Sequence, residues 1–165
     1  MINPRLFEHY GIDTAKNLGI NTICPRPFDT VLIDKQGSCY LCECTAWLPQ
    51  SVGNLHTQSL ETILHTSTAD TLRNSVMNKT YRYCNAKQCS WLLAKDFRYF
   101  VDQEPKQQIR NVRLAIDDSC NLKCPSCRTN LIFEKKGIRY NSRIKHADKI
   151  NNWLKTQKHK KKVHM

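Results

Sequence analysis

A regular alternation of apolar and polar positions begins within the first third of the chain. Residues 28–33 (FDTVLI) are rich in β-branched and aromatic side chains, and the DKQG that follows at 34–37 is a turn signal. Residues 38–42 can return as a second strand. The pattern therefore predicts a β-hairpin, with Cys24 just before it and Cys42 on its second strand.

Two short helices are predicted after the hairpin. Ser59 can cap the first helix, because its side-chain oxygen can accept a hydrogen bond from a backbone N–H of the first turn. Thr68 can cap the second helix in the same way. Each helix has apolar residues at helical spacing, namely Leu60, Ile63 and Leu64 in the first and Leu72, Val76 and Met77 in the second.

A second pattern begins further along the chain. Residues 111–117 (NVRLAID) alternate as a β-strand does, and residues 143–157 repeat apolar positions every three or four residues, as a helix does. The buried face predicted for that helix consists of Ile144, Ala147, Ile150 and Leu154. Because KKVHM at 161–165 looks like the start of another strand, this part predicts a β-loop-α-β unit of a parallel sheet.

The polar, proline-containing stretch DQEPKQQIR separates these two patterns. We therefore expect an N-terminal segment at 1–21, a first module at 22–101, a linker at 102–110 and a second module at 111–165. The N-terminal segment has only a weak signal, which is a short helix around Leu6, Phe7 and Tyr10.

Nine cysteines among 165 residues indicate a metal or redox protein rather than an ordinary soluble domain. Their number is odd, no apolar run is long enough to cross a membrane, and the charged N-terminus does not look like a signal peptide. We therefore expect a cytoplasmic protein whose cysteines bind metal rather than form disulfides.

The net charge of +12 is typical of proteins that bind nucleic acid or an acidic partner. Much of this charge, however, lies in the C-terminal stretch KTQKHKKKVHM, and a terminal lysine run is usually a solvated helix end or tail. We therefore expect neither nucleic acid nor a membrane to be the partner.

Three cysteines stand close together in SCNLKCPSCR: Cys120, Cys124 and Cys127. A closed structural zinc site and a ferredoxin-type cluster each need four ligands, so three thiolates leave one position open. A cubane with three cysteine ligands has one iron atom that can bind another group. The alternative is a zinc site that is completed by Cys44, His146 or His159.

The Cys-x3-Cys-x2-Cys spacing, between a predicted strand and a predicted helix, resembles the radical S-adenosylmethionine (SAM) superfamily. Asn121 and Pro125 match it too, whereas Ser126 stands where the family usually has an aromatic residue. The resemblance implies a [4Fe–4S] cluster on the three cysteines, with S-adenosylmethionine bound to its open iron atom. It also implies an electron donor, reductive cleavage of that cofactor to a 5′-deoxyadenosyl radical, and hydrogen abstraction from a substrate.

Cys24, Gly37 and Cys42, followed by VGNLHTQSLETIL, resemble the SPASM or twitch domain, which holds auxiliary clusters beside radical SAM cores. The resemblance implies a second [4Fe–4S] cluster, whose ligands would be Cys24, Cys42, Cys84 and Cys89. Cys39 or Cys44 could replace Cys42, and zinc stays open as the metal of this site. The WLP at 47–49 is similar to a subgroup in which the auxiliary domain precedes the core.

The resemblance implies a small, cysteine-rich α+β SPASM-like domain followed by the first β-α-β unit of an incomplete α/β radical SAM (partial TIM-like) barrel. Such barrels need about 200 residues or more, and the family's glycine-rich segment would follow Met165. We therefore expect a truncated chain, or one that needs a second polypeptide for the remaining strands, and little activity from this chain alone. Its substrate, possibly a peptide by family analogy, is not readable from the sequence. Two other functions stay open: a basic zinc module that binds nucleic acid, and a non-catalytic iron–sulfur module that transfers electrons.

Overall fold

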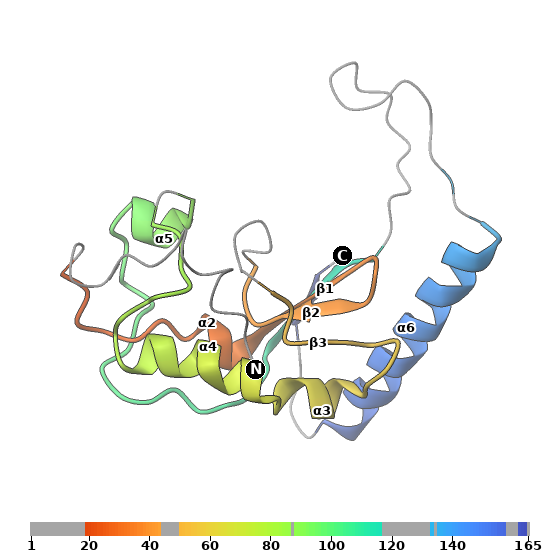
Figure 1. Cartoon of the computed structure of the whole chain (residues 1–165), viewed down its shortest axis with the longest axis horizontal. Helices are drawn as coiled ribbons and strands as arrows, with labels where there is room; N and C mark the ends of the chain where they lie inside the picture. The colour runs from red at the N-terminus through yellow and green to blue at the C-terminus, as the bar shows by residue number, and fades with distance from the viewer. Residues whose placement is uncertain are drawn as a thin grey trace, which may run out of the picture.

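The computed structural model describes residues 19–43, 50–86, 88–116, 133, 135–157 and 162–164. In this part of the chain five strands form one mixed sheet in the order β3-β2-β1-β4-β5, near the centre of Figure 1. They are β1 (Thr30–Asp34), β2 (Ser38–Tyr40), β3 (Gly53–Asn54), β4 (Asn111–Ala115) and β5 (Lys162–His164). The helix expected around Leu6, Phe7 and Tyr10 lies outside the described residues.

The predicted hairpin is confirmed, because β1 and β2 pair antiparallel on either side of the turn. The Asp34 carboxylate accepts hydrogen bonds from the backbone N–H groups of Gln36 and Ser38, at 2.9 and 2.8 Å. Gly37 completes the turn with a φ of +76°, a conformation that favours glycine. The turn signal in the sequence therefore corresponds to specific backbone hydrogen bonds.

The hairpin is shorter than predicted at both ends. Pro25 and Pro27 favour a short helix, α2 (Arg26–Asp29), so Phe28 is helical and β1 begins only after it. At the other end β2 stops at Tyr40, so Cys42 lies beyond the strand and not on it.

The predicted β-loop-α-β unit is present as β4, helix α6 (Ile138–Thr156) and β5, and its two strands pair in parallel. β1 also pairs in parallel with β4, with Val31 opposite Val112. One sheet therefore joins strands from both sides of residues 102–110. Its linear strand order, with β3 and β5 at the edges, is that of a small mixed α/β fold.

Two helices follow the hairpin, as expected, but only one of the two predicted caps is right. α3 (Leu60–Leu64) has Ser59 as its N-cap, whose hydroxyl accepts the Thr62 N–H at 3.1 Å. α4 (Ser67–Met77) is capped by Thr66 and not by Thr68. The Thr66 hydroxyl accepts the Ala69 N–H and also donates to the Val52 carbonyl at 2.8 Å, a tertiary contact that fixes the start of α4.

Helix α6 begins earlier than predicted, and its buried face matches the predicted one only in part, at Ile150 and the partly buried Leu154. Its buried residues are Arg143, His146, Ile150 and Trp153, whereas Ile144 is 45% exposed. The Trp153 ring N–H donates to Glu61 Oε2 at 3.1 Å, and Lys149 donates to the Leu55 carbonyl. These contacts with α3 and with the loop before α3 orient α6. The rotation of α6 about its axis therefore depends on polar partners as much as on apolar spacing.

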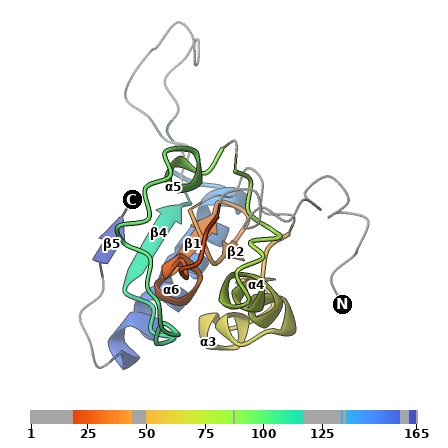
Figure 2. The ribbon, with the colours of Figure 1, turned by 90° about the vertical axis from the view of Figure 1, so that its left-hand side faces the viewer.

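Two apolar clusters stabilise this arrangement. The first packs between the sheet and helices α3 and α6, which lie along one side of the sheet in Figure 1, and it includes Val31, Ile33, Leu55, Ile63, Val112 and Ile150. The second cluster surrounds α4 and α5 (Ser90–Leu93) and consists of Ile20, Ile23, Phe28, Val76, Tyr81, Leu92 and Phe100. Figure 2 views the molecule from this end, with α5 above α4. Among the described helices, none is both long and apolar enough to span a membrane.

Replacing Gly37 with alanine should destabilise the fold more than the same change at Gly19. Both glycines have positive φ, +76° and +65°, where a side chain costs roughly 1–2 kcal/mol. At Gly37 an added Cβ would also lie 2.7 Å from His146 Cε1, whereas at Gly19 it meets no described atom within 4 Å. Urea unfolding of the two variants measures both losses, and equal losses would contradict a contribution from the His146 contact.

Candidate metal centre

Four cysteines from three segments of the chain line one cavity: Cys24, Cys42, Cys84 and Cys89. The cavity measures about 50 Å³, and a single buried water needs about 10–15 Å³ of such space, so the cavity has room for several heavy atoms. The rest of its lining is almost entirely apolar or aromatic, and includes Pro27, Leu41, Leu72, Val76, Leu92 and Phe100. The four partly buried thiol groups therefore share a largely apolar environment.

Each cysteine is positioned by a different local structure. Cys24 follows the bridge between Ile23 and Val101, whose backbones exchange hydrogen bonds of 2.7 and 2.9 Å, and it precedes α2. Cys42 lies just past the end of β2. Cys89 is the N-cap residue of α5, and its own N–H donates to the Asn85 carbonyl at 2.9 Å.

Tyr81 connects the segment of Cys84 to the segment of Cys24. Its side chain is buried, and its hydroxyl donates to the Thr22 carbonyl at 2.7 Å and accepts the Cys24 N–H at 2.9 Å. Its own carbonyl accepts the Cys84 N–H at 2.9 Å. One tyrosine thus fixes the separation of two of the four thiols.

Burial and the proximity of other thiols raise the pKa values of Cys24 and Cys84. For Cys24 and Cys84 the largest cause is burial, and the next is the charge that Cys42 would have as a thiolate. A backbone hydrogen bond from Arg26 partly offsets the rise at Cys24. These two thiols are therefore protonated in the absence of metal, and binding of a cationic metal centre would release their protons.

Zinc and an iron–sulfur cluster both accept four cysteine ligands, but they need them at different separations. Tetrahedral zinc needs its four sulfur ligands about 2.3 Å from one point. Within the described ranges, no three His, Cys, Asp or Glu side chains come close enough together to hold one metal ion. An iron–sulfur cluster needs its thiolates farther apart, around a volume of several atoms, because each thiolate binds a different iron atom.

A charged network borders the cavity on one side. Arg26 Nη1 and Arg113 Nη2 both lie 3.0 Å from the same oxygen of Glu43, which follows Cys42 in the chain. The Arg26 guanidinium also lies over the Trp91 ring, 4.7 Å from its centre. The network thus connects residues next to three of the cysteines with strand β4.

Sequence reasoning did not identify Arg26, Glu43 or Tyr81. Their partners are far away in the sequence. The Tyr81 hydroxyl, for example, accepts the N–H of Cys24, which lies 57 positions earlier. A local pattern contains no signal for such contacts. The only sequence hint was that Arg26 follows the predicted ligand Cys24 by two residues and that Glu43 directly follows Cys42.

Cys39, the suggested substitute for Cys42, lies elsewhere. Its side chain is fully buried in the first apolar cluster, and burial raises its pKa to about 12. The other suggested substitute, Cys44, lies outside the described residues. So do the cysteines of the predicted radical SAM loop, which are Cys120, Cys124 and Cys127, and the alternative zinc ligand His159.

The comparison with protein families agrees with this geometry. Residues 24–90 match the family model of SPASM, an iron–sulfur cluster-binding domain. The matched segment begins at Cys24 and contains all four cysteines that line the cavity. It therefore supports an iron–sulfur cofactor and confirms the SPASM part of the sequence interpretation. No curated protein and no solved structure matches the chain.

Replacing Tyr81 with phenylalanine should lower the free energy of unfolding by roughly 1–3 kcal/mol, since it leaves the Cys24 N–H and the Thr22 carbonyl without their partner. Tyr99→Phe is the matched control, because Tyr99 is 61% exposed, and its effect should stay within about 0.5 kcal/mol. Urea unfolding of the two variants gives both values. A Tyr81→Phe protein as stable as the control would contradict the role of the hydroxyl.

Proposed function

We propose that this chain binds a [4Fe–4S] cluster through Cys24, Cys42, Cys84 and Cys89. The observation on which this rests is that the four thiols line one apolar cavity inside the segment that matches the SPASM domain. When bound, such a cluster supplies one-electron chemistry. The chain's own residues contribute the thiolate ligands, the exclusion of water by aromatic and aliphatic side chains, and the nearby charge of Arg26.

We also propose that the site is the auxiliary centre of a radical SAM enzyme. SPASM domains are typical of such enzymes. The parallel unit of β4, α6 and β5 supports the proposal, because the three-cysteine motif lies in the segment between the carboxyl end of β4 and the start of α6. In this proposal Cys120, Cys124 and Cys127 hold the second [4Fe–4S] cluster, where S-adenosylmethionine is cleaved and hydrogen is then abstracted from a substrate of unidentified class.

A second polypeptide that completes the sheet, and an electron donor, belong to the same proposal. β5 is an edge strand of the described sheet, and its three residues are exposed. Edge strands present unpaired backbone groups to which another strand can bind. An enzyme assembled in this way would be inactive without its partner chain.

Replacing Cys24 or Cys84 with serine should abolish most cluster binding at the first site. Anaerobic reconstitution with iron and sulfide, followed by iron, sulfide and zinc analysis and visible absorbance, measures the cluster content per chain. Cys39→Ser is the matched control and should keep its cluster, because Cys39 lies in the sheet core. Circular dichroism on each apo variant separates a loss of ligands from a loss of fold.

Two results of that experiment would contradict the proposal. The first is zinc near one equivalent without a visible chromophore, which would favour the basic zinc module. The second is equal cluster content in the Cys84→Ser and Cys39→Ser proteins. Two clusters in the unmodified chain, with the electron paramagnetic resonance signal of one changed by S-adenosylmethionine, would favour the radical SAM enzyme over a simple electron-transfer module.

Arg26→Gln should lower the reduction potential of the cluster by tens of millivolts. A positive charge beside a cluster stabilises its reduced form, which has one more electron. Glu43→Gln should raise the potential, because it removes the negative charge that Arg26 contacts at 3.0 Å. Arg26→Lys keeps the charge and is the control for packing. Redox titration followed by electron paramagnetic resonance gives all three values, and shifts of the same sign for Arg26→Gln and Glu43→Gln would contradict this role.

A further inference from the structure

Helix α5 lies beside the cysteine cavity and has an exposed outer side. Cys89 is its N-cap residue, and Leu92 on its inner side is buried, and both residues line the cavity. The next residue, Leu93, is 65% exposed. A protein that bound the outer side of α5 would therefore come within a few side chains of the four thiols.

Stacked aromatic rings connect the surface near α5 to the same cavity. Tyr99 is 61% exposed, and its ring stacks on that of Trp91 with the centroids 5.7 Å apart. The Trp91 ring in turn lies 5.6 Å from that of Phe100, which lines the cavity. Exposed apolar and aromatic side chains that are held in place by such packing are typical of protein–protein interfaces.

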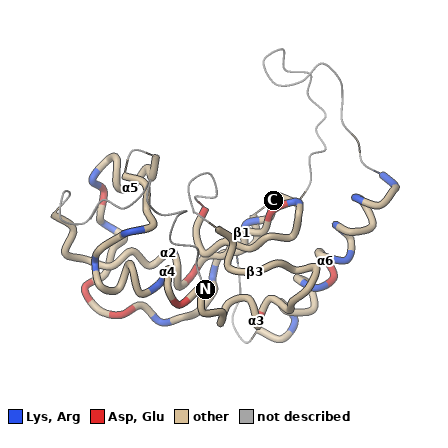
Figure 3. The backbone as a smooth tube through the Cα atoms, viewed as in Figure 1, with Lys and Arg blue, Asp and Glu red and all other residues tan. Residues whose placement is uncertain are grey.

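The surroundings of α5 are basic. Residues 78–101 contain five basic residues and one acidic residue. Of the described basic residues, Arg82, Lys95 and Arg98 are exposed, and Figure 3 shows basic positions next to α5. The acidic residue, Asp96, accepts hydrogen bonds of 2.8 Å from Nε and Nη2 of Arg98. The acidic residues next along the chain line a different cavity. A positive field therefore remains beside the exposed apolar side chains.

Lys95 occupies a backbone position that usually belongs to glycine. α5 ends in a Schellman motif, in which the N–H of Lys95 donates to the Leu92 carbonyl at 3.2 Å. The N–H of Asp96 donates to the Trp91 carbonyl at 2.9 Å. Lys95 has a φ of +50°, which glycine adopts without strain. The lysine thus places a positive charge at the end of α5 in a conformation that disfavours a side chain, so Lys95→Gly removes the charge and also relieves the backbone.

We propose that the outer side of α5, with Leu93, Tyr99, Arg82 and Lys95, is the docking surface of a small acidic protein that has a low-potential one-electron centre. The acceptor is the cluster proposed above for the four cysteines, on which this inference therefore rests. One electron leaves the reduced centre of the partner, which is thereby oxidised, and enters the cluster. No bond forms or breaks, and no proton is transferred.

Charge complementarity selects this partner. Basic side chains around exposed apolar ones attract an acidic protein and steer its encounter with the surface, while the apolar side chains contribute contact area. Leu93 provides such contact to another protein, whereas a nucleic-acid backbone gains nothing from an aliphatic side chain. The surface therefore favours a protein over a nucleic acid.

Isothermal titration of the reconstituted full chain with a plant-type [2Fe–2S] ferredoxin, a small acidic one-electron protein, tests the proposal. We expect saturable binding at low ionic strength that weakens as salt is added, and no binding of cytochrome c, which is basic. Arg82→Gln/Lys95→Gly should weaken the binding of ferredoxin at least about tenfold, and Leu93→Asn should weaken it too. All three residues are exposed, so the variants should fold.

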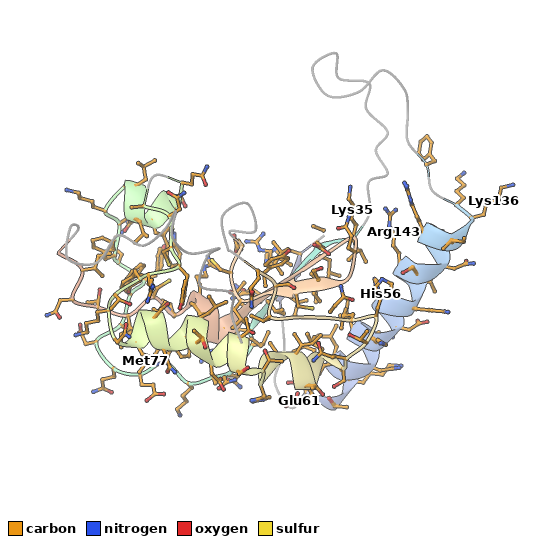
Figure 4. All side chains as sticks on the ribbon, viewed as in Figure 1. Lys35, His56, Glu61, Met77, Lys136 and Arg143 are labelled. Atoms are coloured by element: carbon orange, nitrogen blue, oxygen red, sulfur yellow. The ribbon has the colours of Figure 1, made fainter. Side chains whose placement is uncertain are left out.

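The matched control is Lys136→Gln/Arg139→Gln, which removes the same charge at exposed positions near the start of α6. Figure 4 shows Lys136 at the opposite end of the molecule from α5. The control should change the affinity less than about twofold, because charges farther apart than a Debye length are screened.

The rate at which reduced ferredoxin reduces the cluster is a second readout on the same samples. Stopped-flow absorbance should rank the variants as the titration does, whereas reduction by dithionite, a small molecule that needs no docking surface, should be equally fast in all of them. Cluster content is measured first. A chain without a cluster contradicts the function proposed above, and the titration still decides whether the docking surface exists.

Four results would overturn the docking surface. One is no saturable binding of ferredoxin to a chain that holds its cluster. Another is equal weakening in Arg82→Gln/Lys95→Gly and in the control, which would mean that only net charge attracts the partner. The third is a single-stranded oligonucleotide that binds more tightly than ferredoxin and is weakened by the same substitutions. The fourth is self-association of the chain that Leu93→Asn abolishes, which would mean that a second copy covers this surface.

Discussion

The meeting of four partly buried thiol groups around one apolar cavity is the constraint on which the rest of this structure depends. The thiols come from segments before α2, after β2 and around α5, so these segments must meet although they are far apart in the chain. The second apolar cluster brings them together, and the Tyr81 hydroxyl fixes the separation of two of them. The same burial that excludes water also makes the thiolate forms costly, so a metal centre that supplies positive charge stabilises both the ligands and the fold.

The cavity is also tied to the sheet. Glu43 joins Arg26, at the cavity, to Arg113 on β4, and β4 pairs in parallel with β1. β4 leads along the chain towards the three-cysteine motif. Two arginines share one carboxylate, so the network has an excess positive charge. Such a charge next to a cluster with several thiolate ligands is favourable, and it explains why charged side chains border an otherwise apolar site.

The sequence was informative where local chemistry decides the structure. The DKQG turn, the Ser59 cap and the parallel β4-α6-β5 unit follow from turn residues, capping oxygens and apolar spacing. The sequence was misleading where tertiary contacts decide the structure. The spacing of apolar residues predicted that Ile144 on α6 faces the protein core. Instead His146 and Trp153 face inward, because hydrogen bonds to α3 and to the loop before it set the orientation of the helix. The four cysteines of the cavity were found from a family resemblance, whereas Arg26 and Tyr81 act through contacts that no local pattern contains.

The distribution of charge also changes the meaning of the net charge of +12. A protein that uses basic residues to bind a nucleic-acid backbone usually gathers them into a continuous patch or stripe. The described basic side chains instead have several different surroundings, and Arg73, for example, is buried and donates to the Pro27 and Leu64 carbonyls. Arg26 and Arg113 share Glu43 beside the cysteine cavity, while Lys35 and Arg143 line a second cavity between the hairpin turn and α6. Part of the positive charge therefore has a local partner inside this chain, and the net charge of +12 by itself does not identify a nucleic-acid-binding protein.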